Sequence, residues 1–369
     1  MLGIRTVQYG LGRWTATIVV TSAMAALSAP PVRAADFAGQ TIEIIVPASE
    51  GGGTDFWARF YVPVLQDYLP GNPTVVVRNM GGGGHTIGGN FFANNAQPDG
   101  LMLLASSGTG HFNYLLGDSR VQYEFNEMVS VAGSPVGGVM YVSSDLGVED
   151  AGDVAALEDV TLRYGSQGPT SQDLLSFYAL EQLGIVAQPI FGMGGRSDAR
   201  LAFERGDLNV DYQSTFSYLD NVQPLVESGD AVPIFTFGLL NDEGVLVRDP
   251  AFPDIPHYGE VYEQVNGAPM SGQVEEVYMS FFTAGFGAQK LLSMPAATPA
   301  DIVEAFNDAM LTAQADPAFQ ERRAEVLGPY PQFMGPAAER MKQIATSVSP
   351  EAKSAVAEWL EERFDATVN

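Results

Sequence analysis

The chain has 369 residues, of which 44 are acidic and 18 are lysine or arginine, and its formal net charge is −26 at pH 7. Nucleic acids and anionic membranes are poor partners for so acidic a surface, and a bound anion would need strong local donors. The sequence contains no cysteine, which excludes disulfides, thiol catalysis and cysteine-ligated metals. The length exceeds what one hydrophobic core usually organises, so two lobes are expected.

The N-terminal segment has the pattern of a signal peptide. Two arginines flank a short polar start, and a mostly apolar stretch follows over residues 14–27. Small residues place the expected cleavage between Ala34 and Ala35, so residues 1–34 would be removed. An uncleaved membrane anchor is the alternative, but the apolar stretch is shorter than the roughly 20 residues that a spanning helix needs. We therefore expect a soluble mature chain in the periplasm, with no membrane insertion and no lipid anchor.

The first block of the chain alternates strands with helices through loops rich in glycine or hydroxyl residues. An apolar run at 41–47 stops at a glycine cluster, after which Thr54 and Asp55 begin an amphipathic helix that Pro63 should kink or divide. The same unit then returns, with strands at 74–77 and 101–104, a loop at 81–84 and a helix at 86–95. This alternation predicts a mostly parallel sheet that binds its ligand beyond the carboxyl ends of its strands.

A second block repeats the alternation. Its expected strands are 139–142, 160–164, 188–191, 208–212 and 232–237, with helices at 172–183 and ending at 203. Residues 241–272 are interpreted as a connection rich in proline, glycine and acids, and 281–286 as a strand. Helices through Met310, at 319–326 and at 337–364 are expected to pack back on the first lobe. The predicted division is lobe 1 at 35–137 plus 247–369, and lobe 2 at 138–246.

Motif searches argue against most catalytic chemistry. Neither glycine cluster ends as a phosphate-binding P-loop or has the spacing of a dinucleotide fingerprint. The three histidines, His85, His111 and His257, are not at metal-ligand spacing. There is no nucleophile elbow, and a serine hydrolase would have to combine Ser106 or Ser107 with His111. We expect no metal, no cofactor and no catalytic residue, with an exported hydrolase as the alternative.

Four loops at expected strand ends combine glycine with hydroxyl residues, at 51–55, 82–86, 106–109 and 165–171. Glycine lets the backbone approach a ligand, and the first-turn N–H groups and dipole of a helix favour a carboxylate without a lysine. Any one such loop can equally be only a tight turn. Four along one edge predict an anion-binding cleft built from backbone and hydroxyls rather than from basic side chains.

Three side chains near these loops have two interpretations each. Asp55 is favourable in the first turn of a helix whether or not it touches a ligand. His85 could donate to a carboxylate or be a solvated loop residue, and the sequence does not separate the two. Arg196 could pair with a carboxylate, although an exposed arginine on an acidic surface is the more frequent case.

Five segments together resemble the substrate-binding receptors of tripartite tricarboxylate transporters, the Bug-type proteins: TIEIIVPASEGGGTDFWAR, RNMGGGGHTIGGNFF, PDGLMLLASSGTG, YGSQGPTSQD and FERGDLNVDYQST. Each segment is a weak motif alone, but their order and spacing cover nearly the whole mature chain. The resemblance implies an α/β, type II periplasmic binding protein fold whose two lobes close on a small organic acid, held largely by backbone amides and ordered water. It also implies docking on two membrane permease subunits without chemical change of the acid. We expect a monomer.

Carried over position by position, the resemblance implies a ligand site formed by Gly52, Gly53, Thr54, Asp55, Gly84, His85, Thr86, Ser106, Ser107, Thr109, Ser166, Gly168, Thr170, Ser171, Tyr212 and Gln213. The sequence departs from the family pattern at Ala48, Glu50, Gly194 and Gln213, where relatives often have Phe, Pro, Lys and Asp. The identity of the acid therefore cannot be copied from a relative. A receptor that only senses an organic acid, without transport, remains an alternative.

Overall fold

The structure is a computed structural model that describes residues 35–241 and 243–368, and the chain after residue 33 forms one compact unit. The predicted signal peptide and its cleavage site at Ala34 lie outside the described residues. Within the described ranges, no helix is both long enough and apolar enough to cross a membrane.

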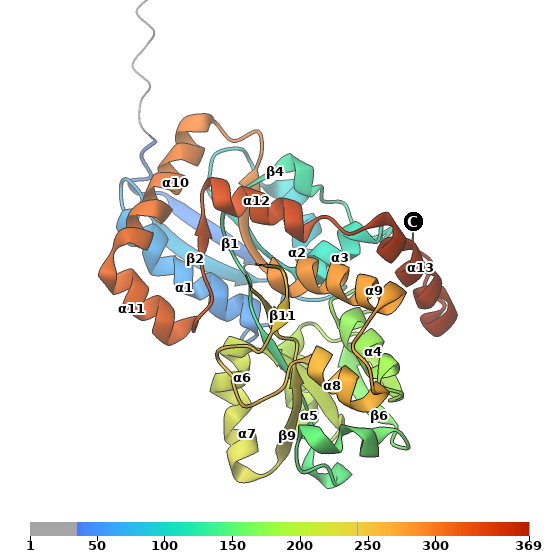
Figure 1. Cartoon of the computed structure of the whole chain (residues 1–369). Coiled ribbons are helices and arrows are strands. Elements are labelled where there is room, and N and C mark those ends of the chain that lie inside the picture. Colours follow the sequence, from blue (N-terminus) through green and yellow to red (C-terminus); the bar gives the residue numbers. More distant parts are fainter. Residues whose placement is uncertain (1–34, 242, 369) are drawn as a thin grey trace, which may run out of the picture. The chain divides into compact units, whose positions relative to one another are not determined.

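The first sheet has six strands in the order β13-β4-β12-β3-β1-β2. Its strands are β1 (Thr41–Val46), β2 (Thr74–Asn79), β3 (Met102–Ser107), β4 (Met128–Ser134), β12 (Lys290–Pro295) and β13 (Phe333–Met334). Strand β1 pairs in parallel with β2 and β3, whereas β12 is antiparallel to both β3 and β4. We refer to this sheet and the helices on it as lobe 1; its strands come from residues 41–134 and 290–334 (Figure 1).

The second sheet has five strands in the order β7-β6-β8-β5-β9. Its strands are β5 (Gly138–Ser143), β6 (Leu162–Ser166), β7 (Ala187–Phe191), β8 (Val210–Ser214) and β9 (Ala231–Thr236). Strand β6 is parallel to β7 and β8, and β5 is antiparallel to β8 and β9. This sheet and its helices are lobe 2, and a small antiparallel pair, β10 (Leu239–Leu240) with β11 (Leu246–Val247), follows it.

The two-lobe α/β fold is therefore confirmed, but both sheets are mixed rather than mostly parallel. The reason lies in the path of the chain. It leaves lobe 1 after β4, enters lobe 2 at β5, and returns to lobe 1 only at β12. A strand that arrives from the other lobe need not follow a right-handed helical crossover, and β12 enters the sheet antiparallel between β3 and β4.

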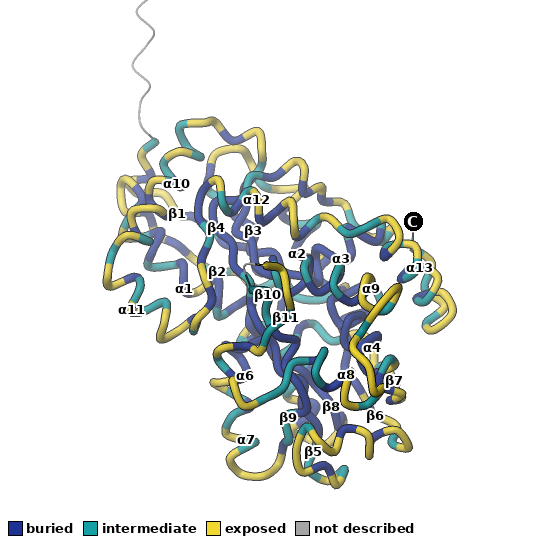
Figure 2. Tube along the Cα trace, in the orientation of Figure 1, coloured by how far each residue is buried: buried dark blue, intermediate teal, exposed yellow. Residues whose placement is uncertain are grey.

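Both faces of the lobe 1 sheet are covered, as alternation along β1 requires. Ile44 and Val46 pack in one cluster with α1 and α10, while Ile45 packs in another with Phe92 of α2. Figure 2 shows the strands buried and the outer faces of the covering helices exposed. The helices of lobe 1 are α1 (Gly53–Tyr68), α2 (Thr86–Asn95), α3 (Gly108–Leu115), η1 (Phe125–Glu127), α10 (Ala300–Ala315), α11 (Pro317–Val326) and α12 (Pro336–Ala345). Helix α1 continues through Pro63 and is not divided.

Lobe 2 and the returning chain contribute the remaining helices: η2 (Ser144–Leu146), η3 (Ala151–Leu157), α4 (Asp173–Gln182), α5 (Arg196–Glu204), α6 (Thr215–Asn221), α7 (Gln223–Ser228), α8 (Tyr258–Asn266), α9 (Gly272–Phe282), the π-helical turn η4 (Thr283–Gly287) and α13 (Pro350–Phe364). The side chain of Tyr258 in α8 packs on Phe235 of β9, with ring centroids 5.5 Å apart.

Three expectations about the C-terminal half were wrong. Residues 281–286 are the end of α9 and the turn η4, because Val277, Tyr278, Phe281 and Phe282 are buried at helical spacing. Residues 241–272 contain α8, which a capping box between His257 and Glu260 begins. The expected helix 337–364 is two helices separated before Pro350, in keeping with the preference of proline for a first turn.

The last helix also packs elsewhere than expected. In α13, Trp359 donates a hydrogen bond to Glu181 of α4 at 3.0 Å, and the ring of Phe364 lies 5.2 Å from that of Phe177. Helix α13 therefore packs against α4 and α9 (Figure 1). Its buried apolar residues belong to the same hydrophobic cluster as those of α4 and α9.

Candidate ligand-binding cleft

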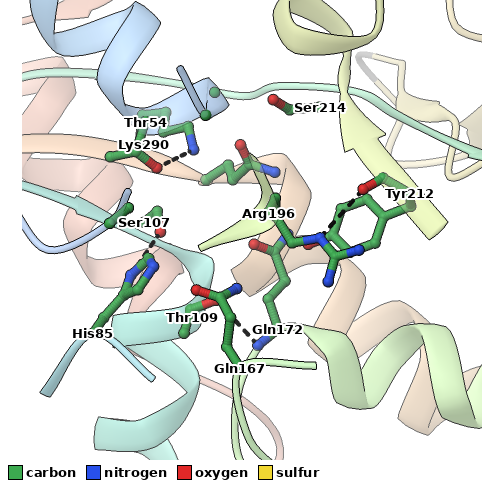
Figure 3. A pocket seen from close by; sticks show the side chains of 14 residues that line it. Thr54, His85, Ser107, Thr109, Gln167, Gln172, Arg196, Tyr212, Ser214 and Lys290 are labelled. Carbon is green, nitrogen blue, oxygen red and sulfur yellow. Dashed lines mark hydrogen bonds between the residues drawn. The ribbon is translucent and has the colours of Figure 1, made fainter. Parts of the chain in front are cut away.

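A cavity lies between the two lobes, and we call it the cleft. Lobe 1 and the returning chain contribute Ala48, Gly52, Gly53, Thr54, His85, Ser107, Thr109, Gln289 and Lys290 to its lining, and lobe 2 contributes Gln167, Gln172, Arg196, Tyr212 and Ser214. Figure 3 shows the labelled side chains converging from both sides. The volume within the cleft that the centre of a water molecule can occupy is about 30 Å³. That volume has room for roughly two waters. The lobes are therefore nearly closed on each other.

Six helices begin at the cleft. The N-cap residues Gly52, His85, Ser107, Gln172 and Ser214 of α1, α2, α3, α4 and α6 all line it, as does Arg196, the first residue of α5. At none of these six described N-termini does the N-cap side chain make a capping hydrogen bond. First-turn N–H groups and the positive ends of helix dipoles therefore face the cleft from both lobes.

The glycine loop before α1 brings that helix close to lobe 2. A Cβ atom on Gly53 would lie 1.8 Å from Ser214 Oγ and 3.0 Å from Ser214 Cβ, so only glycine permits the approach seen. Asp55 stabilises the loop instead of facing the cleft. Its carboxylate accepts from the Gly51 N–H at 2.9 Å and from Arg59 Nε at 2.9 Å.

His85 adopts a left-handed backbone conformation with φ of 70° directly before α2. Its Nδ1 lies 3.2 Å from the hydroxyl of Ser107, which ends β3 (Figure 3). His85 is 3% exposed. Burial, and secondarily the charge of Lys290, lowers the pKa of His85 to about 3. His85 is thus a neutral side chain in the wall of the cleft and not a solvated loop residue.

Lys290 lies at the start of β12, and sequence reasoning missed it. Its ammonium donates to Thr54 Oγ1 at 2.8 Å, beside the first turn of α1 (Figure 3). The expectation of a cleft without basic side chains was therefore wrong. The only signal in the sequence is the short apolar run that follows this lysine, which we did not recognise as a strand.

Arg196 is buried and not exposed, contrary to expectation. Its side chain is 10% exposed and forms ion pairs with Asp173 and Asp211, the first at 3.0 Å. It donates to the carbonyl oxygen of Gly165 at 2.7 Å and lies over the ring of Tyr212, 4.5 Å from the centroid. Because two buried acids pair with it, Arg196 has no positive charge left to offer a ligand.

Seven of the residues expected from the sequence line the cleft: Gly52, Gly53, Thr54, His85, Ser107, Thr109 and Tyr212. The others lie behind the lining: Asp55, Gly84, Thr86, Ser106, Ser166, Gly168, Thr170, Ser171 and Gln213. Direct contact of any of them with a ligand remains a prediction.

Several residues behind the lining hold the loops of lobe 2 in place. Ser166 and Ser171 each donate to Asp173 at 3.0 Å, and Gln213 donates to the carbonyl oxygen of Arg196 at 2.8 Å. Thr170 reaches lobe 1, donating to Asp118 at 2.7 Å. In the same loop Gly168 has φ of 149°, a conformation that side chains rarely adopt.

Behind the lobe 1 lining, hydroxyls and amides close the turns. Thr86 donates to the carbonyl oxygen of Gly83 at 2.8 Å, and the carbonyl oxygen of Gly84 accepts from Asn113. Ser106 lies 2.9 Å from Nε2 of His111, and both are buried. Burial lowers the pKa of His111 to about 3.

The mouth of the cleft is closed by contacts between glycine loops. Ser49 donates to Asp198 at 2.9 Å, and the Gly82 N–H donates to the carbonyl oxygen of Gly194 at 3.4 Å. A Cβ on Gly194 would lie 2.7 Å from the Asp198 carboxylate. The same Cβ would lie 3.1 Å from Ser49 Oγ, so glycine at position 194 leaves room for the contact between these two loops.

Comparisons with known proteins add to this geometry. No family model matches the chain. It is 43% identical to the protein BugT of Bordetella pertussis over 95 residues, which span 26% of this chain and 28% of BugT. It is 27% identical to a UPF0065 protein of the same organism over 322 residues, 85% of this chain and 87% of that protein.

Solved structures share the fold. The periplasmic binding protein BugD matches with a TM-score of 0.60 at 22% identity, over 87% of this chain and 96% of BugD. MatC of Rhodopseudomonas palustris with bound malate matches with a TM-score of 0.61 at 20% identity, over 87% of this chain and 99% of MatC.

Two lobes with a cleft between them are the fold that this chain shares with the periplasmic binding protein BugD. The chain is thus similar in sequence to BugT over one segment, and similar in fold to BugD over most of its length. Of these proteins, BugD is named a binding protein and MatC was solved with a bound acid. Among the described residues, no group of three histidine, aspartate or glutamate side chains is placed to hold a metal ion.

Proposed function

We propose that this protein is a periplasmic receptor that captures a small organic acid in the cleft and delivers it to the permease subunits of a tripartite tricarboxylate-type transporter. One observation carries the proposal: six helix N-termini from two lobes open on a single cavity, and at none of them does the N-cap side chain make a capping hydrogen bond. Uncapped N–H groups and helix dipoles favour a carboxylate. The malate bound by MatC supports the same chemistry.

Hinge motion follows from the size of the cleft. Room for roughly two waters cannot admit a dicarboxylic acid, so the lobes must separate for the acid to enter and close again around it. We propose the lobe division 35–137 with 247–369 and 138–246, with two changes. Because Trp359 and Phe364 of α13 contact α4, α13 should move with lobe 2. Because Tyr258 of α8 packs on β9, α8 should move with lobe 2.

The histidines favour binding over hydrolysis. A serine nucleophile needs a base that accepts its proton near neutral pH. The pKa values of His85 and His111 are both lowered to about 3, mainly by burial, so each is a poor base. Moreover, Ser106 and His111 lie outside the lining of the cleft. We infer that the ligand leaves chemically unchanged, and that the protein acts as an exported monomer with no cofactor.

A thermal-shift screen of the mature chain tests this function. The panel is malate, succinate, adipate, citrate and benzoate, with glucose as a neutral control. At a concentration near 100 times its dissociation constant, a bound acid should stabilise the protein by about 2.7 kcal/mol and raise Tm by about 4 °C. Glucose should give no shift. Hydrolysis of generic esters that is lost in His111→Ala would instead favour the hydrolase. The absence of a thermal shift with all five acids would count against the receptor.

A further inference from the structure

Lys290 is a buried lysine that points into the cleft. Its side chain is 4% exposed and lines the cavity between the lobes. It comes from β12, which pairs with Ser106 and Ser107 of β3 on one side and with Ser134 of β4 on the other. Among the described residues, its one hydrogen-bond partner is the hydroxyl of Thr54, 2.8 Å from Nζ. A hydroxyl satisfies one N–H of the ammonium but supplies no negative charge.

No acid in the described residues forms an ion pair with Lys290. On α1, the carboxylate of Asp55 is engaged by Gly51 and Arg59. On α12, which packs against β12, Glu339 pairs with Lys342. These acids on α1 and α12 therefore already have hydrogen-bond or ion-pair partners other than Lys290.

The other titratable groups around the cleft do not balance the lysine either. His85 of the α2 N-terminus and His111 of α3 are neutral, since burial and the charge of Lys290 keep their pKa values low. Arg196, the other cation of the cleft, is paired with Asp173 and Asp211. Among the described residues, the cleft thus holds one cationic side chain without an ion-pair partner. A buried charge in that position is costly unless an anion joins it.

We propose that Lys290 is the residue that recognises a carboxylate of the ligand, at the end of the cleft formed by Thr54, Ser107 and His85. The inference rests on the proposed function and goes further, because it assigns the recognised charge to one side chain. The uncapped N-termini of α1 and α3 begin beside the same point, at Gly52 and Ser107, and would supply N–H donors to the same carboxylate.

Binding should then be coupled to protonation. Burial lowers the pKa of Lys290 to about 7 in the ligand-free protein, and a bound carboxylate would raise it again. Above pH 7 the neutral lysine must take up a proton as the acid binds. Affinity should therefore fall with rising pH above 7, approaching tenfold per pH unit until the pKa of the complex is reached.

Isothermal titration of the mature protein with the same five acids tests the assignment. The titrations compare wild type with Lys290→Met, at pH 6.5 and pH 8.5 and in two buffers of different ionisation enthalpy. For the tightest binder we expect wild type to take up protons at pH 8.5 and to bind more weakly there than at pH 6.5. Lys290→Met should lose about 100-fold in affinity at pH 6.5 and show neither effect.

Two control variants separate recognition from a general structural role. Lys342→Met removes another buried lysine, which is paired with Glu339 away from the cleft, and should leave affinity within about twofold of wild type. Thr54→Val removes the hydroxyl partner but keeps the ammonium, so affinity should fall about three- to tenfold while the pH dependence persists. Circular dichroism of each variant reports whether it folds.

The outcomes distinguish the two proposals. If wild type binds an acid and Lys290→Met binds it within about threefold at pH 6.5, or if wild type takes up no proton at pH 8.5, the assignment of Lys290 is wrong and the receptor function stands. If wild type binds none of the five acids, the receptor function itself fails, and the role of Lys290 fails with it.

Discussion

The two cations of the cleft differ in what surrounds them. Arg196, from lobe 2, is held by Asp173 and Asp211, by the carbonyl oxygen of Gly165 and by the ring of Tyr212. Lys290, which enters lobe 1 on β12, has one hydroxyl partner and no acid among the described residues. Both line the same cavity, yet only one of them has charge left to offer a ligand.

This contrast explains how a protein with a net charge of −26 can attract an anion. At long range the protein repels it. Inside the cleft, water is scarce and helix N-termini converge, so one uncompensated ammonium acts in a low local dielectric. Arg196 then holds the α5 and β8 ends of lobe 2 in position, whereas Lys290 binds the ligand.

The largest expected effect is on the paired cation. Arg196→Met would leave Asp173 and Asp211 buried without their counter-charge, so we expect a loss of about 3–5 kcal/mol in the free energy of unfolding, measured by urea denaturation. Arg205→Met is the control, because Arg205 pairs with Asp207 on the surface, where both side chains are about 60% exposed. Equal losses in the two variants would contradict the structural role of Arg196.

Substitution of the unpaired cation, Lys290, should have the opposite effect on the free energy of unfolding. Burial lowers the pKa of Lys290 from 10.5 to about 7, so between these values the unfolded chain binds a proton that the folded chain does not. This group therefore makes wild type less stable as pH falls from 10.5 toward 7, and the full penalty persists below 7. Lys290→Met removes the penalty.

We expect Lys290→Met without ligand to be more stable than wild type by about 1–3 kcal/mol at pH 6, with a smaller difference at pH 9.5. Urea denaturation at both pH values measures it. A variant that is less stable than wild type at pH 6 would show that the lysine is a structural member of lobe 1, as Arg196 is of lobe 2.

The smallest expected effect is on the closure of the two lobes. It tests the close approach of Gly53 in lobe 1 to Ser214 in lobe 2. In Gly53→Ala the new Cβ would lie 1.8 Å from Ser214 Oγ, so the closed arrangement should be disfavoured. We expect a larger radius of gyration by small-angle scattering and an affinity about tenfold lower. The double variant Gly53→Ala with Ser214→Gly removes the overlap and should recover most of the affinity. A single variant that closes and binds like wild type would contradict the steric argument.

The sequence predicted the lobe 1 units β1-α1 and β2-α2 well, because each depends on local periodicity and on a glycine loop between a strand and a helix. It also predicted strand β3, but not helix α3 after it. Six of the seven lining residues lie in the expected strand-end loops for the same reason, whereas Tyr212 came only from the family resemblance. Lys290 was missed because β12 is recognisable only from its partners β3 and β4, which lie more than 150 residues earlier in the chain. The burial of Arg196 likewise depends on acids from α4 and β8, which no local pattern reveals.

The most direct test of the account is a crystal structure of the mature protein grown with the acid that gives the largest thermal shift. The account predicts density for that acid between the lobes, with one carboxylate within about 3 Å of Lys290 Nζ and facing the first turn of α1, while Arg196 keeps its pairs with Asp173 and Asp211. An acid bound outside the cleft, or bound with its carboxylate on Arg196 and Lys290 unengaged, would contradict it.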